Sequence, residues 1–149
     1  ILGKTNRTIP TMLDYTTHIK KESMFNTPPV FAVYVSMLTL EWLKEKGGIE
    51  CIEKVNQEKA DLIYSEIDRN PLFRGTAAVE DRSNMNATFL LNDTSLEERF
   101  NQMWQAAGCN GLKGHRSVGG YRASMYNALP IESVQVLVDV MQDLERKVS

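Results

Sequence analysis

The stretch "NMNATFLLNDTSLEERFNQMWQAAG", Asn84 to Gly108, carries two secondary-structure signals in succession. Its first part, Asn84–Leu91, is rich in strand-forming residues and lies between polar segments, which predicts a β-strand. Ser95 is followed three residues later by Glu98, a pairing typical of a helix N-terminus. Apolar residues then recur at helical spacing as far as Gly108, so the stretch predicts a strand followed by a helix.

Two longer helices are predicted before this strand. Thr27 precedes Pro28-Pro29, which suits an N-cap followed by prolines in the first turn, and this helix should run to the Gly47-Gly48 pair. It is apolar on most sides, so we expect it to be largely buried. The second helix, Ile49–Asn70, is amphipathic and ends before Pro71. Its stripe consists of Ile52, Val55, Lys59, Ile63 and Ile67.

After the stretch, Gly111–Arg116 and Gly120–Asn127 are predicted to form two strands around a Ser117–Gly119 turn. Pro130 opens a last helix. The stripe of that helix consists of Val134, Leu137, Val138, Met141 and Val148. The order α-α-β-α-β-β-α predicts an α+β domain with a mainly antiparallel sheet and helices packed on one face. Residues 1–29 show little periodicity and are expected to form an irregular arm.

The composition excludes several classes of function. The 149 residues suit one domain with a hydrophobic core, and a formal charge of −2 gives no reason to expect a nucleic-acid partner. No apolar run approaches the roughly 20 residues that a membrane-spanning helix needs. Cys51 and Cys109 lack metal-type spacing, so we expect reduced thiols in a cytoplasmic protein, and no metal. Because the chain starts with Ile1 rather than Met, we expect it to be part of a longer polypeptide.

A basic cluster occupies "KGHRSVGGYRAS", Lys113 to Ser124. Strand alternation places Tyr121, Ala123 and Met125 on one face and Arg122 on the other, while His115 and Arg116 end the preceding predicted strand. Guanidinium groups suit carboxylate and phosphate because each can donate two parallel, charge-assisted hydrogen bonds. His115, Arg116 and Arg122 are therefore candidates for binding a small dianion. The alternative is that the arginines face water or pair with glutamates of a neighbouring helix.

Two weaker patterns also have functional readings. Asn26 and Thr27 precede a predicted helix, whose N-terminus can bind phosphate, although a threonine followed by proline is more often only a cap. Cys109 and His115 are a conceivable nucleophile and base. No third group that would orient such a pair is identified, and an inert thiol is the commoner outcome.

Five segments, in order and with the right spacings, resemble the phosphoserine aminotransferase family: "MLDYTTH", "SMFNTPPVFAVYV", "EWLKEKGGIE", "DRSNMNATF" and "LKGHRSVGGYRASMYNALP". The resemblance extends from about Pro10 to the end of the chain. It implies a fold-type I, pyridoxal 5'-phosphate (PLP)-dependent homodimer that transfers an amino group between glutamate and 3-phosphohydroxypyruvate. The products are phosphoserine and 2-oxoglutarate, in serine synthesis and in many bacteria also in pyridoxine synthesis.

The resemblance also implies a division of the chain and roles for single residues. Residues 1–29 would be an arm and the end of a large domain outside this chain, and residues 30–149 the C-terminal small domain. Asn26 and Thr27 would hold the phosphate of PLP bound to the partner subunit. His115 and Arg116 would bind the substrate phosphate, and Arg122 the substrate carboxylate.

The resemblance places the Schiff-base lysine outside this chain, and Lys113 does not match it. No catalytic residue is therefore assigned here, and the chain alone is expected to lack transaminase activity. Two other hypotheses remain open: a standalone module that binds a small phosphorylated acid or mediates oligomerisation, and a different aminotransferase activity of the same fold type.

Overall fold

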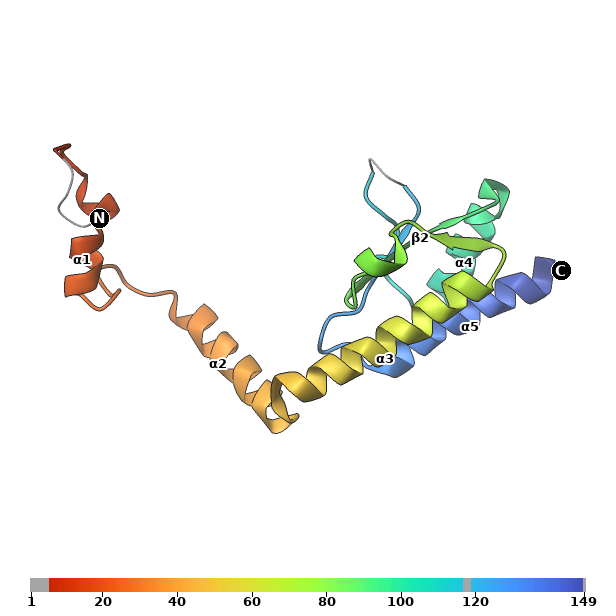
Figure 1. Cartoon of the computed structure of the whole chain (residues 1–149), viewed down its shortest axis with the longest axis horizontal. Helices are drawn as coiled ribbons and strands as arrows, with labels where there is room; N and C mark the ends of the chain where they lie inside the picture. Colours follow the sequence, from red (N-terminus) through yellow and green to blue (C-terminus); the bar gives the residue numbers. More distant parts are fainter. Residues whose placement is uncertain (1–5, 117–118, 149) are drawn as a thin grey trace. The chain divides into compact units, whose positions relative to one another are not determined.

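The computed structural model of the chain describes residues 6–116 and 119–148 (Figure 1). The chain divides into two compact units, residues 1–42 and residues 43–149. The division falls inside helix α2, Val30–Glu45.

The first unit contains a 3-10 turn, η1 (Thr11–Leu13), and a short helix, α1 (Tyr15–Lys20). The Asp14 carboxylate accepts a hydrogen bond from the backbone N–H of Thr16 at 2.9 Å, which caps α1. The prediction of an irregular arm over residues 1–29 is therefore wrong for this part. Six residues are too few to show a helical period, and the local cap is the only sequence signal.

Helix α2 begins at Val30, and the Pro29 carbonyl accepts a hydrogen bond from the N–H of Val33 at 3.1 Å. The predicted N-cap at Thr27 is therefore wrong, and both prolines precede the helix. The reason is steric: Thr27 and Pro28 each precede a proline, which disfavours the helical conformation at both positions.

None of the residues of α2 is buried, although the sequence predicted a largely buried helix. Phe31 is 79% exposed and Leu40 is 64% exposed. That prediction is wrong for this chain. In the described part of the first unit the only other helical elements are η1 and α1, which are too short to cover a helix of 16 residues.

The second unit is a three-stranded antiparallel sheet covered on one face by helices. Strands β1 (Phe73–Gly75), β2 (Asn86–Leu91) and β3 (Tyr121–Ser124) lie in the order β1-β2-β3. Helices α3 (Gly48–Arg69) and α5 (Ile131–Val148) pack side by side (Figure 1). Helix α4 (Glu97–Ala106) packs against α5. The predicted α+β class is confirmed.

The strands alternate between a buried and an outer face, as the sequence predicted. In β3, Tyr121 and Ala123 are buried and Arg122 is exposed. The register pairs Phe89 with Tyr121 and Thr88 with Arg122. Aromatic rings fill the core between sheet and helices, with the centroids of Phe100 and Tyr121 4.9 Å apart.

Two strand predictions differ from the structure, and one strand was not predicted. Gly111–Arg116 is not a strand and makes only an isolated bridge between Lys113 and Tyr121, while β3 is shorter than the predicted Gly120–Asn127. β1 was missed because three residues carry too short a pattern. Part of the predicted Ser117–Gly119 turn lies outside the described residues.

Two helix details also differ. The predicted cap at Ser95 is wrong, because the Asp93 carboxylate accepts from the N–H of Ser95 at 2.9 Å and opens a 3-10 turn, η3 (Thr94–Leu96), ahead of α4. In α5, Val148 is 41% exposed whereas Leu144, absent from the predicted stripe, is fully buried.

Candidate functional site

The basic residues before β3 line a hollow of about 210 Å³. Lys113, His115 and Arg116 contribute the groups that can carry positive charge, and all three are exposed. The remaining lining residues are Glu97, Asn101, Gly114, Gly119, Gly120 and Tyr121. Groups that bind anions therefore gather just before the start of β3, and they include two of the three residues that the sequence predicted to bind a dianion.

Glycines make this local backbone possible. The N–H of Gly114 donates to the Gly120 carbonyl, and the N–H of Gly119 donates to the His115 carbonyl, both at 2.8 Å. A Cβ on Gly114 would lie 2.2 Å from the Gly119 carbonyl oxygen, and Gly120 has φ of +64°. A larger residue at either position would push apart the backbone that presents His115 and Arg116.

Arg122 lies on the outer face of the sheet, opposite the helices. The backbone N–H of Arg122 donates to the Leu112 carbonyl at 2.7 Å, which ties β3 to the segment that leads to His115 and Arg116. Its side chain is exposed and is not among those lining the hollow of His115 and Arg116. Combined binding of one dianion by all three residues remains a prediction.

The carboxylate of Glu97 and the phenol of Tyr121 also line the hollow. Burial raises the pKa of Tyr121 to about 12, and the Glu97 carboxylate adds to the shift. Tyr121 therefore stays neutral at physiological pH. Sequence reasoning missed Glu97 and Asn101, which stand four residues apart on α4 and so share one helical face. Only the tertiary structure reveals them, because it places α4 at the same hollow as His115 and Arg116.

Asn26 and Thr27 lie in the first unit, just ahead of α2, and both are exposed. The Asn26 amide nitrogen donates to the Met12 sulfur at 3.6 Å. A thioether is a weak acceptor, so this amide remains suited to a stronger acceptor such as a phosphate oxygen.

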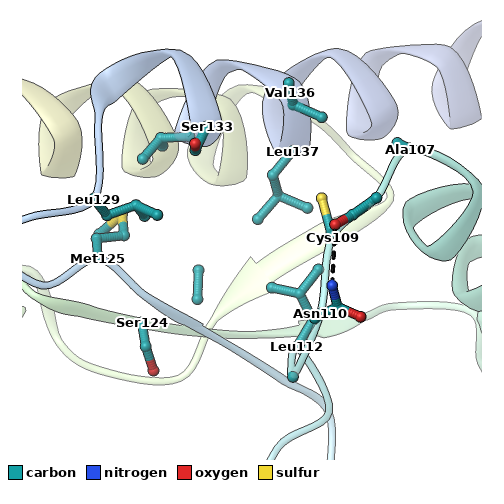
Figure 2. A pocket seen from close by; sticks show the side chains of 14 residues that line it. Ala107, Cys109, Asn110, Leu112, Ser124, Met125, Leu129, Ser133, Val136 and Leu137 are labelled. Carbon is teal, nitrogen blue, oxygen red and sulfur yellow. Dashed lines mark hydrogen bonds between the residues drawn. The ribbon is translucent and has the colours of Figure 1, made fainter.

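A larger pocket of about 380 Å³ lies between β3 and α5 (Figure 2). Its walls are mainly apolar side chains, including Leu112, Met125 and Leu137, which do not suit a dianion. Cys109 lines this pocket and not the basic hollow, and burial raises the pKa of its thiol. A thiol held in its protonated form is a poor nucleophile, which disfavours the Cys109–His115 pairing.

The described residues contain neither a metal-binding cluster nor a helix that could span a membrane. Among residues 6–116 and 119–148 there is no group of three or more His, Cys, Asp or Glu side chains placed to hold a metal ion. In the same part of the chain, each helix is too short or too polar to cross a membrane.

Known proteins resemble this chain over nearly all of its length. Phosphoserine aminotransferases of Flavobacterium psychrophilum and Flavobacterium johnsoniae are each 71% identical to it over 148 residues, which cover 99% of this chain and 42% of theirs. The structure of phosphoserine aminotransferase from Bacillus circulans subsp. alkalophilus matches with a TM-score of 0.88 at 44% identity. That match covers 99% of this chain and 41% of the other.

PLP-bound phosphoserine aminotransferase from Trichomonas vaginalis matches with a TM-score of 0.80 at 38% identity, over 93% of this chain and 40% of that one. The chain thus spans about two-fifths of the length of these relatives. A model of the class-V aminotransferase family matches residues 1–137. Since this match extends over most of the chain, the chain belongs to the class-V aminotransferase family.

Proposed function

We propose that this chain is the C-terminal part of a PLP-dependent phosphoserine aminotransferase. The observation that carries the proposal is 71% identity, over 99% of the chain, to proteins of that name. The complete enzyme would transfer an amino group between glutamate and 3-phosphohydroxypyruvate, giving phosphoserine and 2-oxoglutarate.

In this proposal the second unit recognises the substrate. His115 and Arg116 bind the substrate phosphate, which is supported by their place at one hollow together with Lys113. Arg122 binds the substrate carboxylate, which is supported by its exposure on the outer face of the sheet. Planar guanidinium groups fit both anions because they donate two parallel hydrogen bonds.

Asn26 and Thr27 fit the phosphate portion of PLP. An exposed amide and an exposed hydroxyl ahead of a helix of 16 residues are the neutral donors that a phosphate accepts from. In a homodimer these residues would hold the phosphate of the cofactor in the partner subunit. When bound, PLP supplies the electron sink for amino transfer, whereas these two residues only position it.

Turnover measurements test the proposal. The chain of 149 residues and the full-length protein that contains it are each assayed for 2-oxoglutarate-dependent consumption of phosphoserine. We expect turnover by the full-length protein and none by the chain alone. An inactive full-length protein that still binds phosphoserine would favour a binding module, and clear turnover by the chain alone would contradict the assignment of the Schiff-base lysine to another part.

A further inference from the structure

Lys59 is a fully buried lysine in the middle of α3, with 0% of its surface exposed. It occupies a position in the stripe of α3 that otherwise holds apolar residues such as Ile63 and Ile67. Burying an ammonium is costly unless its hydrogen-bonding capacity is satisfied. A lysine at such a position therefore needs a structural or functional reason.

The Lys59 ammonium is satisfied by three backbone carbonyls. Its Nζ donates to the carbonyl oxygens of Met125 at 3.2 Å, Tyr126 at 2.9 Å and Leu129 at 3.2 Å. An ammonium has three donors, so these contacts use all of them. Hydrogen bonds from a charged donor are stronger than those between neutral groups.

A second side chain of α3 binds the same segment. Asn56 is buried and lies one turn before Lys59, and its amide nitrogen donates to the Asn127 side-chain oxygen at 2.8 Å. Residues 125–129 make up most of the connection between the end of β3 and the start of α5, which runs from Met125 to Pro130. Lys59 and Asn56 together therefore fix this connection to α3.

The connection begins where β3 ends, three residues after Arg122. On one side β3 is aligned by its pairing with β2, which sets Thr88 opposite Arg122. Beyond the strand, the N–H of Met125 donates to the Met85 carbonyl at 2.7 Å. The carbonyl of the same Met125 is the first of the three acceptors of Lys59, so the strand end is held from two directions.

We propose that Lys59 is a positioning residue for the substrate carboxylate: its buried ammonium fixes the 125–129 connection and thereby the strand end that presents Arg122. This inference rests on the proposed function. Lys59 touches no substrate. It acts by restricting where the guanidinium of Arg122 can lie.

The test uses the full-length aminotransferase with Lys59→Met, which keeps an unbranched apolar chain and removes the three donors. Glutamate and phosphoserine share the carboxylate that Arg122 would bind. We therefore expect KM for both to rise by the same factor, roughly 3- to 30-fold, because small misplacements of a binding group are costly. The change in kcat should stay within about twofold, as for lost uniform binding.

Two controls separate positioning from loss of stability. Lys54→Met removes an exposed lysine from the same helix and should leave both KM values unchanged. Val138→Ala removes buried volume from α5 and should lower the melting temperature without changing either KM. If Lys59→Met does not fold, Asn56→Ala removes the hydrogen bond to Asn127, leaves the three donors of Lys59 in place, and should give a smaller rise of KM in the same direction.

The outcomes are distinguishable from failure of the proposed function. The positioning role is overturned, and the proposed function stands, if Arg122→Lys weakens binding of both amino donors but Lys59→Met lowers only the melting temperature. Where Lys59→Met does not fold, the same conclusion follows if Asn56→Ala leaves both KM values unchanged. If Arg122→Lys changes neither KM, the assignment of Arg122 itself is wrong. A rise of KM for phosphoserine alone would place the effect of Lys59 at the phosphate and would also overturn the inference.

Discussion

Arg122 is the residue whose chemistry is least replaceable in the proposed site. Arg122→Lys keeps the charge but loses the planar pair of donors, so binding of the substrate carboxylate should weaken by about 1–3 kcal/mol. Substrate titrations of the full-length enzyme measure this. As a matched control, Arg99→Lys changes an exposed arginine of α4 and should leave the affinity unchanged. Equal affinities for Arg122→Lys and the unaltered enzyme would remove Arg122 from the site.

Glu66 is a buried carboxylate at the contact between α3 and α5. Its side chain is 3% exposed. Its oxygens accept from Arg69 at 2.8 and 3.1 Å, from Asn70 at 2.8 Å and from Gln142 at 3.2 Å. Burial alone would raise the pKa of Glu66, but the hydrogen bonds from Arg69, Asn70 and Gln142 outweigh it and the pKa is lowered.

The lowered pKa of Glu66 predicts acid sensitivity. Since the unfolded chain binds the proton more readily, the stabilisation is complete above the ordinary glutamate pKa of about 4.3 and is lost as pH falls through the lower folded value. Glu66→Gln should cost about 1–3 kcal/mol at pH 7 and much less in strong acid. Melting temperatures between pH 7 and pH 3 measure this. Glu53→Gln, an exposed carboxyl on α3, is the control, and a pH-independent difference for Glu66→Gln would contradict the prediction.

At the level of single elements, the turn before β3 depends on Gly120. A Cβ there would lie 2.3 Å from Leu90 Cδ2 and 2.7 Å from the Phe89 carbonyl oxygen, at φ of +64°. Gly120→Ala should therefore cost more than the 1–2 kcal/mol or so of a left-handed backbone alone. Gly108→Ala is the matched control, because Gly108 has φ of +82° but open space around its Cβ position. Denaturant unfolding compares the two, and equal losses would show that the clash with β2 is relieved.

The element predictions succeeded where the pattern was long. Helices α3 and α5 follow periodic apolar residues over enough positions to define a face, and strand β2 follows a run of strand-forming residues between polar segments. β1 and α1 were missed because each is too short, and the cap of α4 was misplaced because Asp93 forms the local hydrogen bond two residues earlier than expected. Short helices and strands are stabilised by contacts with other segments of the fold, and a local sequence pattern does not reveal those contacts.

Across the chain, α2 differs from α3 and α5 in that none of its residues is buried. Amide hydrogens in a helix without tertiary packing are protected only by its own hydrogen bonds, so they should exchange readily. Hydrogen exchange of the isolated chain, followed by mass spectrometry, should show rapid exchange in 30–42 and slow exchange in 56–67 and 134–144. Equal protection of α2 and α3 would mean that α2 is covered in solution, for example by a second copy. Peptides from α4 serve as an internal reference for a partly packed helix.

Helices α3 and α5, strand β2, the buried face of β3 and the basic cluster follow from the sequence alone, because local composition, apolar period and glycine placement define them. Only the tertiary structure placed Glu97 at the hollow of His115 and Arg116, and only it brought three backbone carbonyls to Lys59. Lys59 appeared in the sequence merely as a charged residue in an apolar stripe. Its acceptors lie 66 to 70 residues away along the chain, and only folding brings them within hydrogen-bonding distance.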